Sequence, residues 1–292
     1  MLPVIRPALT IRLQPNRLWF APGPGWAALA GGLAAGALRP GADFWTQNRL
    51  SLLLLAMLWL LFDPLLGTVW HLLLDRRLAH RIGETARRPN RPVRPLLPYV
   101  AKGSAGYRLS AVAAALREHN GEWQTLLLLT LTGGGMAFWL GPVTAACALL
   151  SLGLAAWVAS RPAPHSAQAH LGHSAGLFLL PYAAALSVLG DATGDALLPA
   201  LGYGVVYWGN LQLAAGEGRG ERAVILGQGA VAAYLFAAVQ PLAALVVSLG
   251  GVFALLARRQ TAGWQTADGL RRIQPFLLAG LLAAAMAVGG SG

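Results

Sequence analysis

The chain has 292 residues, of which 56% are hydrophobic and only 11% are charged. Because soluble domains carry about 25% charged residues, this composition excludes an ordinary soluble protein and indicates an integral membrane protein. The net charge of +11 comes mainly from arginines between apolar stretches, which is typical of topology signals rather than of a nucleic-acid-binding surface. The single cysteine, Cys147, excludes a disulfide framework.

Nine apolar segments follow one another along the chain, and we expect each to form a membrane-spanning helix. They cover residues 22–38, 49–74, 124–140, 142–160, 174–190, 196–215, 222–239, 241–257 and 274–289. Basic residues concentrate in alternate connections: the N-terminal segment, residues 75–122, Arg161, residues 216–222 and residues 258–272. Since lysine and arginine mark cytoplasmic loops, this alternation predicts a cytoplasmic N-terminus and an external C-terminus. Only the first external loop, with Arg39 and Arg49, departs from the pattern.

The predicted fold is therefore a single all-α polytopic membrane domain over residues 1–292. We expect nine transmembrane helices around a central chamber that opens to the cytoplasm, in a bacterial inner membrane. Residues 75–122 are long, basic and proline-rich, and they predict a cytoplasmic cap loop; within them GYRLSAVAAALREHNGEW is typical of an amphipathic helix. Residues 209–222, GNLQLAAGEGRGER, are polar and glycine-rich and predict a second cytoplasmic loop.

The second apolar segment carries a polar stripe. Gly67, His71 and Asp75 are four residues apart, so they line one face of a helix. A polar stripe on a membrane helix usually faces the bundle interior or a wet cavity. Asp63, just before Pro64, has two interpretations: it caps a helix that restarts after Pro64, or it extends the stripe by one turn.

Two further polar clusters lie between the spans. His165, His170 and His173 have no cysteine or carboxylate nearby, so an ordinary polar cytoplasmic loop is favoured over a metal site. Asp191 and Asp195 fall on the opposite side of the membrane by the same topology, where a solvated turn or a helix cap is expected.

Four stretches carry a resemblance to a known family. IRLQPNRLWFAPGPGWAALAGGLAAG is similar to an Arg/Pro/Trp entry into a first helix, and GTVWHLLLDRR occupies the place of an N-x-x-x-D-x-x-x-D motif. RRPNRPV, residues 87–93, is similar to K-P-x-R-P-I, and GEGRGERAVILG, residues 216–227, is similar to the tail of a second aspartate motif. With nine spans and candidate functional loops after the second and sixth, the chain resembles the UbiA superfamily of intramembrane prenyltransferases.

The resemblance implies a site in which two aspartate-rich motifs hold Mg²⁺ against the diphosphate of an isoprenoid donor. This chain departs from that pattern, because Gly67 and His71 replace the first two motif residues and only Asp75 remains as a candidate metal ligand. Gln212 and Gly216 stand where the second motif has aspartates, with Glu217 as the nearest carboxylate. Four arginines serve either as diphosphate or anionic-headgroup contacts or as orientation charges: Arg88, Arg91, Arg219 and Arg222.

Two functional hypotheses follow, and neither assigns a catalytic residue. In the first, the protein has lost Mg²⁺-dependent prenyl transfer and either binds an isoprenoid, quinone or pigment or packs as a subunit of a membrane assembly. In the alternative, it is a divergent prenyltransferase that holds Mg²⁺ with Asp75, Glu217 and Asp63. A transporter is a third, less favoured option, and His71 as an axial ligand to a chlorin or haem is a side option. The expected partners are membrane lipids or isoprenoids and other membrane subunits.

Overall fold

The computed structural model describes residues 23–38, 43–74, 107, 110, 120–161, 166–190, 193–260 and 267–290, and side chains are described outside residues 120–123, 257–260 and 267–272. Within these ranges every regular element is a helix. Three continuous helical stretches are long and apolar enough to cross a membrane: Arg49–Leu74, Pro142–Ala159 and Ala167–Leu189. The predictions of an all-helical chain and of membrane character are confirmed to this extent.

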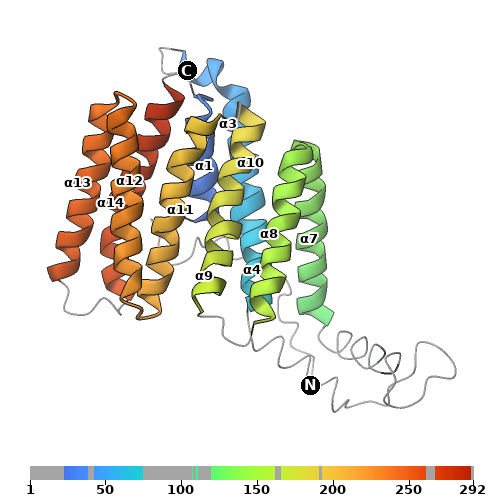
Figure 1. Cartoon of the computed structure of the whole chain (residues 1–292). Coiled ribbons are helices and arrows are strands. Elements are labelled where there is room, and N and C mark those ends of the chain that lie inside the picture. The colour runs from blue at the N-terminus through green and yellow to red at the C-terminus, as the bar shows by residue number, and fades with distance from the viewer. Residues whose placement is uncertain are drawn as a thin grey trace, which may run out of the picture.

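Every predicted apolar segment contains a helix, and residues 44–47 and 167–173, which lie in predicted connections, are helical too. In chain order they are α1 (Pro24–Ala34), α2 (Phe44–Gln47), α3 (Arg49–Leu60), η1 (Leu61–Leu66), α4 (Gly67–Leu74), α7 (Asn120–Leu140), α8 (Pro142–Ala159), α9 (Ala167–Ser174), η2 (Ala175–Leu179), α10 (Leu180–Leu189), α11 (Gly194–Ala214), α12 (Arg219–Ala237), α13 (Pro241–Gln260) and α14 (Ala267–Gly289). The runs α3–η1–α4 and α9–η2–α10 are each continuous. Successive long stretches run in opposite directions, so the chain passes up and down through the bundle (Figure 1).

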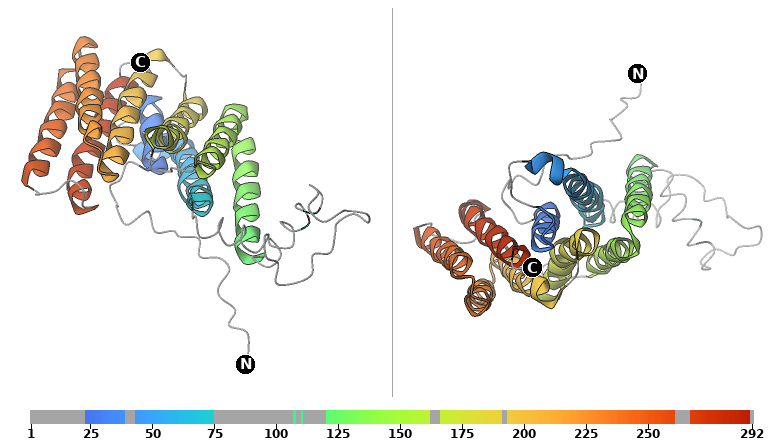
Figure 2. Two further views of the ribbon diagram at one scale, coloured as in Figure 1. Left: turned by 60° about the horizontal axis from the view of Figure 1, so that its bottom comes forward. Right: turned by 90° about the horizontal axis from the view of Figure 1, so that it is seen from above.

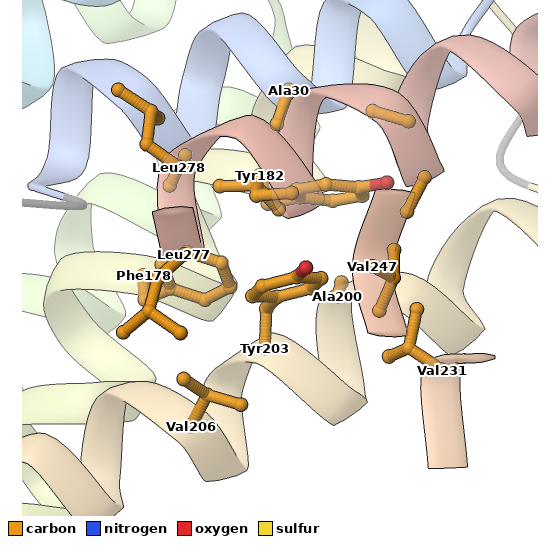
Figure 3. Close-up of a cluster of buried hydrophobic side chains, with 14 of the residues drawn as sticks. Ala30, Phe178, Tyr182, Ala200, Tyr203, Val206, Val231, Val247, Leu277 and Leu278 are labelled. Atoms are coloured by element: carbon orange, nitrogen blue, oxygen red, sulfur yellow. The ribbon is translucent and has the colours of Figure 1, made fainter. Parts of the chain in front are cut away.

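Helix α1 lies on the inside of an arc that the other long helices form in chain order (Figure 2). It contacts α10, α14 and α3, and small residues allow these close approaches. The main hydrophobic cluster fills the space between α1, α10 and the helices α11 to α14. Figure 3 shows its principal side chains, among them Phe178, Tyr182, Tyr203, Val231, Val247 and Leu277.

Two π-helical turns, η1 and η2, interrupt the long helices. In η1 the cause is Pro64, which has no N–H and whose ring clashes with the carbonyl four residues earlier. The helix widens instead of breaking, and the Gly67 N–H bonds to the carbonyl of Phe62, five residues back. Because no helix restarts after Pro64, the interpretation of Asp63 as a cap is wrong.

The α11–α12 connection is much shorter than the loop predicted at 209–222. Residues 209–214 belong to α11 and residues 219–222 to α12, so the turn covers only 215–218. Gly216 has a φ of 82° and closes α11 with two hydrogen bonds, Gly216 N–H to Leu213 O at 3.0 Å and Glu217 N–H to Gln212 O at 2.9 Å. Gly209 and Gly220 also bring the two backbones together. The polar composition reflects a close helix pair, not a loop.

The connections that were predicted to be cytoplasmic and those predicted to be external lie at opposite ends of the bundle. The end of α4, the start of α7 and the α11–α12 turn lie at the lower end of Figure 1, whereas the end of α14 lies at the upper end. The predicted cap loop at 75–122 falls largely outside the described residues, with its last three residues forming the start of α7.

Candidate functional site

The first motif remnant lies on the continuous helix η1–α4. Asp63 and Gly67 share one face, because a Cβ placed on Gly67 would lie 3.9 Å from Oδ1 of Asp63. Gly67 is half-buried, and His71 is exposed near the lower end of α4. The other predicted residues of this region, Asp75, Arg88 and Arg91, lie outside the described residues.

The second motif remnant lies at the end of α11. Gln212 is 1% exposed, and its Oε1 has no hydrogen-bond partner within the described part of the chain. Gly216 is exposed in the turn, and Glu217 is half-buried beside it. Arg219 and Arg222 are exposed on the first turns of α12, at the lower end of the bundle. They are therefore accessible to an anionic group.

Helix α9 joins the two helices that carry these remnants. On one side, the indole of Trp70 on α4 contacts the ring of His173, with centroids 5.1 Å apart. On the other side, the Trp208 indole N–H on α11 donates to the Ala167 carbonyl at 3.1 Å. Ser174 adds a hydrogen bond from its hydroxyl to the Gly204 carbonyl of α11 at 2.6 Å. Both remnants thus belong to helices that pack on α9.

The loop predicted around the three histidines is wrong for two of them. His170 and His173 lie in α9, which Ser166 caps by accepting the Ala169 N–H at 3.3 Å. His170 is buried, and Nδ1 of His173 lies 2.9 Å from the Ala169 carbonyl oxygen. A polar sequence is helical here because tertiary packing buries one of its faces. His165 lies outside the described residues.

A buried hydrogen-bond network holds the π-helical turn η2 against α4 and α8. The Trp70 indole N–H donates to the Ser151 hydroxyl at 2.9 Å, and that hydroxyl donates to the Gly176 carbonyl at 3.0 Å. Gly176 is required at this point, because a Cβ there would overlap Cζ2 of Trp70 and lie 3.0 Å from Cη2. The indole therefore occupies the space that a side chain on η2 would take.

A carboxylate–aromatic cluster surrounds Asp63 at the start of α1. A Cβ on Gly25 would lie 2.6 Å from Cε2 of Trp59 and 3.0 Å from Oδ2 of Asp63, so the α1 backbone touches both side chains. The rings of Trp26 and Trp59 meet edge to face, with centroids 5.1 Å apart and an interplanar angle of 68°. The Tyr207 hydroxyl of α11 lies within electrostatic range of the Asp63 carboxylate.

The aromatic members of this cluster were not among the residues expected at the site. Trp59 precedes Asp63 by four residues and so shares its helix face, a spacing that the sequence does show. Trp26 and Tyr207 come from α1 and α11, so only tertiary packing places them near Asp63.

The described motif positions do not by themselves fit Mg²⁺. This ion takes near-octahedral oxygen coordination, usually with one or two carboxylates and substrate phosphates. The described motif positions offer a glycine, an imidazole, an amide and a second glycine, at Gly67, His71, Gln212 and Gly216. Among the residues the structure describes, no three His, Cys, Asp or Glu side chains gather to hold a metal ion.

Comparisons with known proteins returned no match: no protein-family model, no curated protein and no solved structure matches the chain.

Proposed function

We propose that this protein is a UbiA-like membrane bundle that holds an isoprenoid, quinone or pigment without transferring prenyl groups. In this proposal nine helices span the membrane around a chamber open at the lower end of Figure 1, which faces the cytoplasm. The ligand lies between α4, α9 and α11, with its polar end at Gln212. The protein acts alone or as a subunit of a larger membrane assembly.

The strongest support for the proposal comes from the side chains at the motif positions, which lie on two helices that α9 joins. A buried amide oxygen without a hydrogen-bond partner in the described part of the chain, on Gln212, suits a ligand hydroxyl or N–H. It supplies no negative charge to hold a divalent metal against a diphosphate. Removing one electrostatic contributor to a transition state commonly lowers the rate by about 100-fold to 1,000-fold, and several are replaced here.

The first test is to identify what the protein carries. We expect purification from its native membrane, followed by mass spectrometry of the extract, to recover one prenylated or tetrapyrrole compound in stoichiometric amount. Gln212→Leu lowers the recovery, whereas Gln228→Leu serves as a matched control because it removes another buried amide, on α12. Recovery of bulk phospholipid alone, or equal loss in both variants, contradicts the proposal.

The second test addresses the alternative enzyme. Purified protein is incubated with geranylgeranyl or farnesyl diphosphate, Mg²⁺ and a panel of aromatic acceptors, and prenylated products are measured. We expect none. Mg²⁺-dependent turnover that Asp75→Ala abolishes would establish the divergent prenyltransferase instead.

The third test concerns orientation. In a Cys147→Ala background, a cysteine at Gly218 in the α11–α12 turn should react with a membrane-impermeant reagent only from the cytoplasmic side. A cysteine at Gly290, after α14, should react only from the outside. Labelling of both positions from one side contradicts the predicted number of spans.

A further inference from the structure

Asp63 is set apart from the other described carboxylates by its depth. Asp43, Asp195, Glu217 and Glu221 all lie at helix ends, next to the connections. Asp63 lies within the continuous helix Arg49–Leu74, 11 residues from its lower end, which corresponds to about 16 Å at 1.5 Å per residue. An ionisable side chain at such a depth in a membrane bundle is costly and commonly has a specific partner.

The described neighbours of Asp63 are neutral. Gly25 and Trp59 touch it, and Tyr207 is the titratable group in electrostatic range. Within the described residues its carboxylate makes no hydrogen bond or ion pair. The N-terminus of α1 contributes about half a positive charge, which favours the ionised carboxylate but leaves the site negative. Among the described residues nothing balances the charge of this carboxylate, so a cation or a proton from outside the cluster must do so.

The rings at the site select among cations. Trp26, Trp59 and Tyr207 are each half-buried, so their surfaces are not sealed by the bundle. The ring of Phe178 stacks on that of Tyr207, with centroids 5.9 Å apart, and holds it in place. Indole and phenol faces attract organic ammonium ions, whereas divalent metals need several oxygen ligands. One carboxylate with three rings matches an ammonium group and not a metal.

We propose that Asp63, Trp26, Trp59 and Tyr207 form a binding site for an organic ammonium ion. The carboxylate balances the charge, and the rings contact the N-methyl or methylene groups. The site goes beyond the proposed isoprenoid binding and does not depend on it, because it uses neither Gln212 nor the motif positions. The ammonium group belongs either to a small solute or to a lipid headgroup.

The test is binding of radiolabelled choline to the full-length protein in phosphatidylglycerol nanodiscs, which contain no ammonium lipid. We expect saturable binding that tetramethylammonium displaces and that 3,3-dimethyl-1-butanol, the neutral isostere of choline, does not. Asp63→Asn should weaken binding about 10-fold to 100-fold, as expected for losing a charged partner. Asp43→Asn removes a carboxylate at a helix end and should leave binding unchanged.

A second pair of variants keeps the proposal testable if Asp63→Asn does not fold. Trp59→Phe retains a ring and should weaken binding less than Trp59→Leu does. Phosphatidylcholine nanodiscs distinguish the sources: loss of choline binding there indicates that the lipid headgroup occupies the site, and unchanged binding indicates a small solute. No saturable binding, equal displacement by the neutral isostere, displacement by Na⁺ or Mg²⁺ at equal concentration, or wild-type affinity in Asp63→Asn overturns the proposal.

Discussion

Gly176 offers a sharp test of the packing between η2 and α4. In Gly176→Ala the new Cβ overlaps Cζ2 of Trp70, so the indole must move and its N–H leaves the Ser151 hydroxyl. Overpacking of this kind costs about 1–3 kcal/mol, and the lost buried hydrogen bond about 1 kcal/mol more. The higher helix propensity of alanine offsets up to about 1 kcal/mol of this cost. The net loss in the free energy of unfolding is therefore about 1–3 kcal/mol.

The matched control is Gly153→Ala in α8, where a Cβ meets nothing within 4 Å. This variant keeps the propensity gain without the overlap, so the two variants should differ by about 2–4 kcal/mol. At about 2–4 °C per kcal/mol, their melting midpoints should differ by about 4–16 °C. The assay is size-exclusion chromatography of detergent-solubilised protein after heating. Trp70→Leu removes the indole, and in that background Gly176→Ala should cost little further stability. Equal midpoints for the two glycine variants would refute the reasoning.

For four further substitutions the structure determines whether stability rises or falls, and each change is measured by the same melting midpoint. Ser151→Ala removes the partner of the Trp70 indole N–H and should cost about 1–3 kcal/mol. Val239 closes α12 at a φ of 58°, the position that Gly216 holds after α11; Val239→Gly should gain about 0.5–1 kcal/mol, and Gly216→Val should lose a similar amount. Gly220→Val places a side chain against the Gly209 carbonyl and should separate α11 from α12, at a cost of about 2 kcal/mol or more.

Each of these predictions has either a control variant or an outcome that would contradict it. Ser248→Ala replaces an exposed serine on α13 and should leave the midpoint unchanged. A loss on Val239→Gly would show that the valine side chain contributes more than its backbone conformation costs. Gly229→Ala on α12, where a Cβ meets nothing within 4 Å, should be neutral or stabilising. A similar loss there would mean that α12 responds to any substitution, and not specifically to contact with α11.

The all-helical class of the chain was predictable from the sequence, because a bilayer leaves an apolar chain few alternatives. A chain that is 56% hydrophobic must satisfy its backbone hydrogen bonds internally, so its apolar segments form helices. The predicted segments accordingly coincide with helices from α1 to α14. The four-residue spacing of Asp63 and Gly67 also indicated that they share one face of the continuous helix η1–α4.

Only the tertiary structure decided which helices meet. Hydropathy describes each segment separately, whereas packing depends on how several segments fit together. His170 lies in a polar stretch whose sequence predicts a loop, yet packing buries this residue in α9. Nothing local links Trp26 and Tyr207 to Asp63; Trp26 meets Trp59 where Gly25 lets the α1 backbone touch η1, and Tyr207 on α11 lies within electrostatic range. The side chains around Asp63 come from three separate helices, an arrangement that no local pattern in the sequence encodes.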